Sequence, residues 1–260
     1  VSYNLDPASL HAAVRGLDPG LRAAGVIPVD LFGLPADYEA IDAVCAQHGL
    51  WVIADAAQGV GGAIGDRPVG RFAPLTTTSF FPAKPLGCYG DGGAIVALDP
   101  EDAKVLRSVR VHGSGSDKYD NVRLGINGRL DTLQAAILIE KLRIFPDELE
   151  RRDQVAAAYT EVLAGHVTTP LVPEGVRSAW AQYTVRVDDR DVVAKELGQA
   201  GIPTAVYYPL PLHRQQAYAG YPVGAGGMAN SDRAAGEVLS LPMHPYLEAD
   251  DQAKVTAGLL

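Results

Sequence analysis

The sequence predicts an α/β fold with a mostly parallel central sheet, followed by a smaller α+β domain. Short apolar segments alternate with segments of helical periodicity through the first half of the chain, which is typical of βαβ units. Capping residues and prolines mark the ends of the helical segments. The chain has 260 residues, 47% of them hydrophobic, and can therefore bury a sizeable core. We expect a larger domain over residues 1–145 and a smaller one over residues 146–260.

The helices of the first half are predicted mainly by their ends. Asp6 precedes a proline and predicts a helix that runs to about Val14. Residues 37–47 place apolar side chains on one face and stop before Gly49, a residue that commonly ends helices. Asp99, followed by a proline and two acids, opens a further helix, because acidic side chains are favourable at the positive end of the helix dipole.

Strands are predicted where apolar runs are too short for helices. These runs lie at residues 25–31, 51–54, 75–80 and 93–97. The run at 51–54 ends in Asp55, so a buried parallel strand carries a carboxylate at its carboxyl end. Open α/β sheets bind their ligands at this edge, and Asp55 is therefore a candidate site residue.

The second half opens with a long helical pattern. Residues 131–134 resemble a capping box, and an apolar stripe at helical spacing follows over residues 135–142. We expect Pro146 to kink or break this helix. The remaining expected elements are a helix at 151–163, a connection at 165–176, a strand at 181–187, a helix at 191–200, a strand at 204–207 and a helix at 250–258.

Lys84 is the most informative residue of the chain. A lysine that reacts with an aldehyde must be held at a fixed point and stripped of water. Lys84 lies between a strand rich in Thr, Ser and Phe and a Gly-rich turn, 29 residues after the strand-end Asp55. This setting predicts a Schiff-base lysine rather than a solvated surface charge.

Three motifs carry a resemblance to a known family. They are Asp-Ala-Ala-Gln at 55–58, Ser-Phe-Phe-Pro-Ala-Lys at 79–84 and Gly-Ile-Asn-Gly-Arg-Leu-Asp-Thr-Leu-Gln-Ala-Ala at 125–136. Through most of its length the chain resembles the sugar-nucleotide aminotransferases of the DegT/DnrJ/EryC1/StrS group. The resemblance implies the fold of the fold type I PLP-dependent transferases, which is aspartate aminotransferase-like, and pyridoxal 5'-phosphate as cofactor.

The resemblance also implies a role for each motif residue. Lys84 is expected to form the Schiff base and to act as general base, and Asp55 to meet the pyridine nitrogen. Gln58 is expected beside the hydroxyl oxygen of the ring, and Ser79 at the phosphate. Asn127 is expected to reach the phosphate in the neighbouring subunit's site, which implies a homodimer with shared active sites.

Arg129, Tyr207 and Tyr208 are the candidate substrate contacts. The planar fork of Arg129 suits a substrate carboxylate in the partner's site. The segments at 79–93, 203–212 and 239–247 resemble the branch that aminates UDP-2-acetamido-2-deoxy-3-oxo-glucuronic acid. In that branch glutamate is the donor and leaves as 2-oxoglutarate, so the resemblance implies a ping-pong aminotransferase acting on a UDP-linked keto sugar.

Some features depart from the family pattern. Ala54 stands where the family usually has Glu, and Tyr207 stands where the branch usually has His. The N-terminal part of the family fold, which carries a phosphate loop, is expected to be absent, because Val1 corresponds to the middle of the large domain. Three alternatives stay open: an inactive fragment or dimerising paralogue, an enzyme directed at amino acids, and a PLP-dependent sugar dehydratase. Lys84 counts against the last, in which histidine is expected at this position.

Composition excludes other classes of function. The net charge of -9, from 22 basic and 31 acidic residues, argues against a nucleic-acid partner. No apolar run approaches the roughly 20 residues that span a bilayer, and no signal peptide is recognisable, so we expect no membrane partner and a cytoplasmic protein. Cys45 and Cys88 offer neither a disulfide framework nor metal-ligand spacing. His112, His213 and His244 are expected to be structural.

Overall fold

A four-stranded sheet lies at the centre of the N-terminal part of the chain. The computed structural model describes residues 2–117 and 119–260. The strands are ordered β1-β2-β5-β6 and comprise β1 (Gly25–Val26), β2 (Trp51–Asp55), β5 (Leu75–Ser79) and β6 (Gly93–Ala97). The pairs β1·β2 and β2·β5 are parallel, and β5·β6 is antiparallel. The expected α/β fold with a mostly parallel sheet is confirmed.

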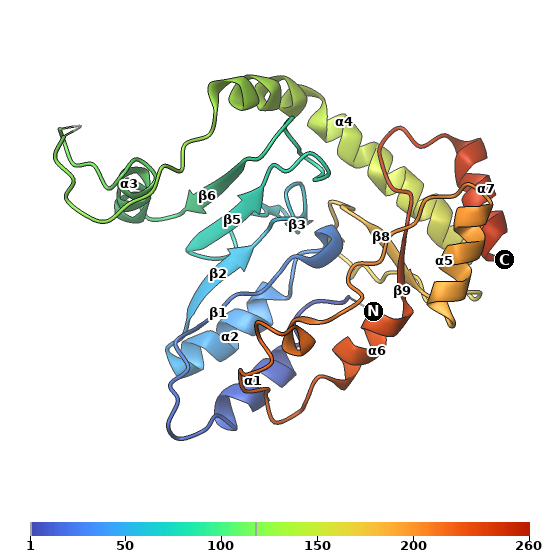
Figure 1. The fold of residues 1–260 in the computed structure, drawn as a ribbon, viewed down its shortest axis with the longest axis horizontal. Coiled ribbons are helices and arrows are strands. Elements are labelled where there is room, and N and C mark those ends of the chain that lie inside the picture. Colours follow the sequence, from blue (N-terminus) through green and yellow to red (C-terminus); the bar gives the residue numbers. More distant parts are fainter. Residues whose placement is uncertain (1, 118) are drawn as a thin grey trace.

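The register of β2 and β5 brings their carboxyl ends together. Asp55 is the partner of Thr77 in this ladder, so both strands end at the same edge of the sheet. The β-branched residues of β5 suit a pleated, half-buried strand. Figure 1 shows this edge in blue and green, facing the long helix α4 and the C-terminal part of the chain.

Aspartate caps open the three N-terminal helices, and those at Asp6 and Asp99 were predicted. They are α1 (Pro7–Arg15), α2 (Tyr38–His48) and α3 (Pro100–Val109). The carboxylates of Asp6, Asp37 and Asp99 each accept a backbone N–H of the first turn, which supplies a partner to a donor that the helix leaves unpaired. Gly49 ends α2 in the left-handed region, with φ of 64°.

Helix α4 (Thr132–Leu163) differs from the expectation of two helices. It continues through Pro146 for 32 residues, although proline lacks the N–H that would bond to the preceding turn. Figure 1 shows the ribbon of α4 changing direction along its length. The expected capping box is wrong, because Asp131 makes no side-chain cap and Gln134 is used elsewhere.

The apolar stripe at the start of α4 is mostly not packed within this chain. Leu138 is buried, but Leu133, Ile139 and Leu142 are 78%, 55% and 51% exposed. Within the described residues, the predicted stripe over residues 135–142 is therefore buried only at Leu138.

The C-terminal part is a small α+β unit. The strands β8 (Tyr183–Arg186) and β9 (Val238–Leu241) pair in antiparallel fashion, and α5 (Arg190–Gln199) and α7 (Ala249–Leu259) pack beside them. The expected strand at 204–207 is reduced to a single bridge between Ala205 and Ser240. The remaining elements are the helix α6 (Ala229–Glu237), the 3-10 turns η1 (Leu31–Gly33) and η2 (Leu212–Arg214), and the short strands β3 (Ala63–Ile64), β4 (Arg67–Pro68) and β7 (Val176–Arg177).

Three apolar clusters form the core of the described residues. One draws all its buried members from residues 26–73 and a second from residues 155–255. The third joins Leu86 and Cys88 to α4 through Leu138, Phe145 and Leu149. This third cluster packs the segment that carries Lys84 against the long helix.

Candidate active site

The carboxyl ends of β2 and β5 are joined by side chains as well as by the ladder. Thr78 Oγ1 donates to the carbonyl of Ala56 at 2.9 Å. Asp55 is half-buried, and its Oδ1 accepts the N–H of Ala57 at 3.0 Å. Its Oδ2 makes no hydrogen bond with the described residues. The carboxylate therefore keeps an oxygen available at the edge where a ligand is expected.

Gln58 is 5% exposed and lies between two distant segments. Its Oε1 accepts the N–H of Phe32 at 2.6 Å, and its Nε2 lies 3.3 Å from the hydroxyl of Tyr208. Partial burial raises the pKa of Tyr208. The structure thus brings together a residue expected at the cofactor and one expected at the substrate.

Lys84 sits in a short loop, residues 80–92, which we call the lysine loop. The Lys84 N–H donates to the carbonyl of Phe81 at 2.8 Å, and Ser79 Oγ accepts the N–H of Phe81 at 3.2 Å. The Lys84 side chain is half-buried and makes no hydrogen bond or ion pair within the described residues. Its amine is thus not engaged by another side chain of the described residues.

Side chains of α4 hold the lysine loop in place. Gln134 Oε1 accepts the N–H of Tyr89 at 2.8 Å, and Lys141 Nζ donates to the carbonyl of Gly87 at 2.6 Å. A Cβ at Gly87 would lie 2.6 Å from the carbonyl oxygen of Pro82, so only glycine fits this turn. The sequence interpretation missed Gln134 and Lys141 because neither lies near the loop in the chain.

Asn127 and Arg129 lie apart from these residues, in a segment we call the arm (residues 110–117 and 119–131). Arg129 donates from Nε and Nη2 to Asn127 Oδ1 at 3.1 and 2.9 Å. In the part of the chain that the structure describes, no hydrogen bond joins either residue to the β2 and β5 edge. Figure 1 shows the arm extending past α3, away from the C-terminal part.

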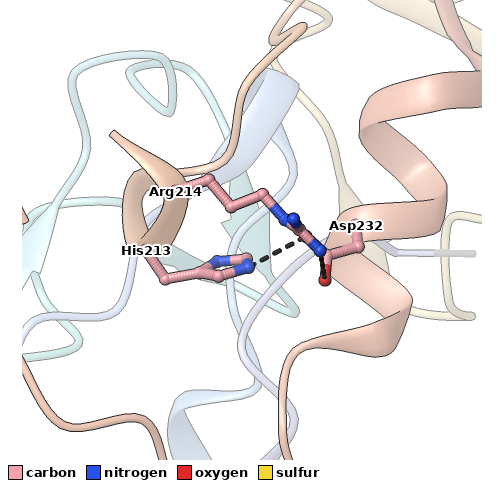
Figure 2. Close-up of polar contacts among 3 residues, drawn as sticks. All are labelled: His213, Arg214 and Asp232. Carbon is pink, nitrogen blue, oxygen red and sulfur yellow. Dashed lines mark hydrogen bonds and ion pairs between the residues drawn. The ribbon is translucent and has the colours of Figure 1, made fainter. Parts of the chain in front are cut away.

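The segment that follows Tyr207 and Tyr208 is anchored by an ion-pair cluster. Figure 2 shows His213 and Arg214 of η2 meeting Asp232 of α6, with His213 Nε2 2.9 Å from Asp232 Oδ1. Arg214 bonds both oxygens of the carboxylate and, together with His213, lowers the pKa of Asp232 to about 2. His213 therefore has a structural role, because its contact with Asp232 joins η2 to α6.

Asp30 is a buried carboxyl that the sequence interpretation missed. It is 0% exposed, and its Oδ1 accepts the N–H of Ala36 at 3.0 Å and the hydroxyl of Tyr38 at 2.8 Å. Its Oδ2 has no partner among the described residues, and burial raises its pKa to about 6. Its backbone N–H donates to the carbonyl of Asp55, so Asp30 supports the site edge from below. A charged residue within the apolar run at 25–31 is the sequence signal for it.

The described residues hold neither a metal-binding cluster nor a membrane-spanning helix. None of their His, Cys, Asp and Glu side chains gather in threes that could hold a metal ion. None of the helices in this part of the chain combines the length and the apolar character that crossing a bilayer requires.

Comparison with known proteins decides the family. The chain matches the DegT/DnrJ/EryC1/StrS aminotransferase family over residues 1–260. The protein belongs to this family. It is 45% identical to UDP-2-acetamido-2-deoxy-3-oxo-D-glucuronate aminotransferase of Pseudomonas aeruginosa, over 99% of this chain and 70% of that protein. Further relatives at 38% identity are also named as sugar aminotransferases. This family member is therefore an enzyme of the transferase class, and the dehydratase alternative is not favoured.

Solved structures support the same assignment. A DegT DnrJ EryC1 StrS aminotransferase from Brucella abortus is 49% identical, with a TM-score of 0.97 over 99% of this chain and 70% of that one. The protein ntda from Bacillus subtilis, solved with bound cofactor PMP, is 30% identical, with a TM-score of 0.86 over 99% of this chain and 59% of that one. The family depends on pyridoxal phosphate, which confirms the expected cofactor.

The residues present fit this cofactor. The Lys84 amine has no carboxylate to neutralise it, and the Asp55 carboxylate keeps a free oxygen at the same edge of the sheet. Ser79 ends β5, the strand that pairs with the one ending in Asp55. An amine, an acid and a hydroxyl are the groups that an aldehyde, a pyridine nitrogen and a phosphate require.

Proposed function

We propose that this protein transfers an amino group from glutamate to a UDP-linked keto sugar, UDP-2-acetamido-2-deoxy-3-oxo-glucuronic acid, by a ping-pong mechanism. The 45% identity with the Pseudomonas aeruginosa enzyme supports the choice of sugar. The observation that carries the reaction is the unpaired Lys84 amine in a loop fixed by α4, beside the edge that ends in Asp55.

The proposed roles follow from the chemistry of each group. When bound, pyridoxal phosphate supplies an electron sink for the bond that breaks at the carbon bearing the amino group. Lys84 Nζ binds the cofactor and, when free, takes and returns the substrate proton. The Asp55 carboxylate holds the proton of the ring nitrogen in place. Ser79 and Gln58 orient the phosphate and the ring, so that the reacting groups keep their alignment.

The proposal includes a homodimer in which the arm completes the partner's site. Leu124, Ile126 and Leu133 are 97%, 64% and 78% exposed, so the arm and the start of α4 present apolar surface that this chain leaves uncovered. Surfaces of this kind mark interaction sites. Within a dimer, Asn127 is proposed to reach the cofactor phosphate, and Arg129 a carboxylate of the substrate.

The proposed substrate segment lies in the C-terminal part. Tyr208 is 51% exposed, and its neighbour Tyr207 shares a ring contact with it, with centroids 5.4 Å apart. We propose both as substrate contacts and a domain boundary near residue 145, which the separate apolar clusters at 26–73 and 155–255 support. A cytoplasmic location is also part of the proposal, because sugar-nucleotide substrates are anionic and do not cross membranes unaided.

Absorbance of the purified protein tests the function. Pyridoxal phosphate is added, and the visible band of the bound cofactor is recorded before and after glutamate. We expect a band that Lys84→Ala lacks and that glutamate shifts to shorter wavelength. Lys104→Ala is the matched control, because Lys104 is an exposed lysine on α3 paired with Glu101. Absence of the band in the unchanged protein would reject the proposal, and a band that only another amino acid shifts would reject glutamate as donor.

A further inference from the structure

The Gln58 side chain joins three segments that are distant in the sequence. It accepts from Phe32 of η1 at 2.6 Å and lies 3.3 Å from Tyr208, which is 150 residues away. Gln58 itself follows the end of β2 and is 5% exposed. The contact therefore connects the cofactor edge of the N-terminal part directly with the segment proposed to meet the substrate.

The chemistry of the neighbours fixes the orientation of the Gln58 amide. A backbone N–H can only donate, so the atom that faces Phe32 must be the carbonyl oxygen Oε1. The amide nitrogen Nε2 is then turned toward Tyr208, whose hydroxyl oxygen accepts. Nε2 has a second hydrogen, which is left for an acceptor at the site. Gln58 therefore has one amide hydrogen to donate to a group of the cofactor.

Tyr208 has its own hydrogen available in this arrangement. Because its oxygen accepts from Gln58, the hydroxyl proton is free to point to an acceptor on a bound substrate. Tyr208 is only half-buried, so its outer face is open to such a ligand. The Tyr208 hydroxyl would then donate to the substrate and accept from the Gln58 amide, which faces the cofactor.

We propose that Tyr208 is a positioning residue for the cofactor, which acts through Gln58 by holding its Nε2 toward the site. This inference rests on the proposed function and adds to it a coupling between the substrate segment and the cofactor edge. At 3.3 Å the hydrogen bond is longer than the usual 2.9–3.0 Å, so a moderate effect is expected.

The test is a double-mutant cycle on cofactor affinity. The dissociation constant of pyridoxal phosphate is measured by absorbance titration for the unchanged protein, Tyr208→Phe, Gln58→Ala and the double variant. We expect Tyr208→Phe to weaken binding by about three- to tenfold, the worth of one hydrogen bond, and to have no further effect when Gln58 is already replaced. The cofactor band should also shift in Tyr208→Phe.

Controls make each outcome decisive. Tyr221→Phe changes an exposed tyrosine outside the proposed contacts, whose hydroxyl makes no hydrogen bond in the described residues, and should leave cofactor affinity unchanged. Gln58→Met replaces Gln58→Ala if the latter does not fold, since it keeps the length of the side chain. Equal effects of Tyr208→Phe in both backgrounds, or no effect in either, would overturn the coupling. Failure of the unchanged protein to bind the cofactor would instead reject the proposed function, and this role with it.

Discussion

The lysine loop and the arm are both expected at the active site, but they are held in different ways. The lysine loop is tied to α4 by Gln134 and Lys141 and packs two buried residues into the core beneath it. The hydrogen bonds of the arm mostly stay within it and the end of α3, as between His112 and Ile126 at 2.9 Å. The lysine loop is complete within one chain, whereas the arm leaves its apolar side chains uncovered.

This difference indicates a division of the site into contacts that one chain makes by itself and contacts that a second subunit is proposed to supply. A reacting amine must be fixed to a fraction of an ångström, and contacts within the same chain achieve this before any association. In the proposed homodimer, the phosphate and substrate contacts assigned to the second subunit would need to be correct only once the dimer has formed. The following predictions test this division, from the largest expected effect to the smallest.

Mixing two inactive variants tests whether the arm of one subunit completes the site that holds Lys84 of the other. We expect Lys84→Ala and Asn127→Ala each to lose activity, the former by at least roughly a thousandfold, because it removes the reacting amine. Subunits of the two variants, mixed and allowed to exchange, should recover about a quarter of the unchanged activity. Half of the dimers are then mixed, and each has one site with both residues intact.

The control for this experiment is a mixture of Lys84→Ala with Asp55→Ala. Both residues belong to the same chain's contribution, so this pair should recover nothing. Recovery in the control, or none with Asn127→Ala, would show that the arm does not complete a partner's site.

Gly87→Ala sharpens the claim that the lysine loop is rigid. The new Cβ would lie 2.6 and 2.7 Å from the carbonyl oxygens of Pro82 and Phe81, and backbone cannot move aside cheaply. We expect the free energy of unfolding to fall by about 2–3 kcal/mol, measured with denaturant, and cofactor affinity to fall with it. Gly220→Ala, where nothing lies within 4 Å, should change neither quantity. Similar values for the two variants would mean that the loop can relax.

Asp30→Asn tests the support beneath the same edge. Burial raises the pKa of Asp30 to about 6, so between about pH 4 and pH 6 the folded chain binds more protons than the unfolded one. The free energy of unfolding of the unchanged protein should therefore fall as pH rises through this window and level off above it. The variant removes the charge and should lack that fall, which amounts to at most about 3 kcal/mol.

Denaturant unfolding at several pH values measures this effect. The variant keeps an acceptor for Tyr38 and the N–H of Ala36. Asp66→Asn, at an exposed position, should follow the unchanged protein. Parallel curves for Asp30→Asn and the unchanged protein would mean that folding does not raise the pKa of Asp30.

Sequence signals predicted the features that short-range chemistry determines. The caps at Asp6 and Asp99 act within one turn, and each helix begins where its cap predicts. Gln134 shows where this reasoning fails, since it matches a capping box but bonds Tyr89, 45 residues away. Burial and long-range partners decide such cases, and neither is visible in a local pattern.

In the candidate site, too, local motifs were predicted and long-range contacts were not. The motif residues Lys84 and Asp55 were predicted from the sequence. In the structure Asp55 ends β2 and Lys84 lies in the loop that follows the paired strand β5, but their catalytic roles stay predictions. The contact of Gln58 with Tyr208 could not be predicted, because it spans 150 residues and depends on how two parts of the chain dock. The strand expected at 204–207 failed for a related reason, since only Ala205 finds a partner there.

The unbroken course of α4 has a consequence for anyone who wishes to recombine relatives of this enzyme. The first half of the helix holds the lysine loop through Gln134 and Lys141, and its last turns place Tyr159 and Leu163 in the C-terminal core. A crossover at residue 145 falls inside this helix, and would join the C-terminal part of one relative to the loop support of another. Chimeras that exchange substrate preference should therefore inherit α4 whole, with their junction placed after Leu163.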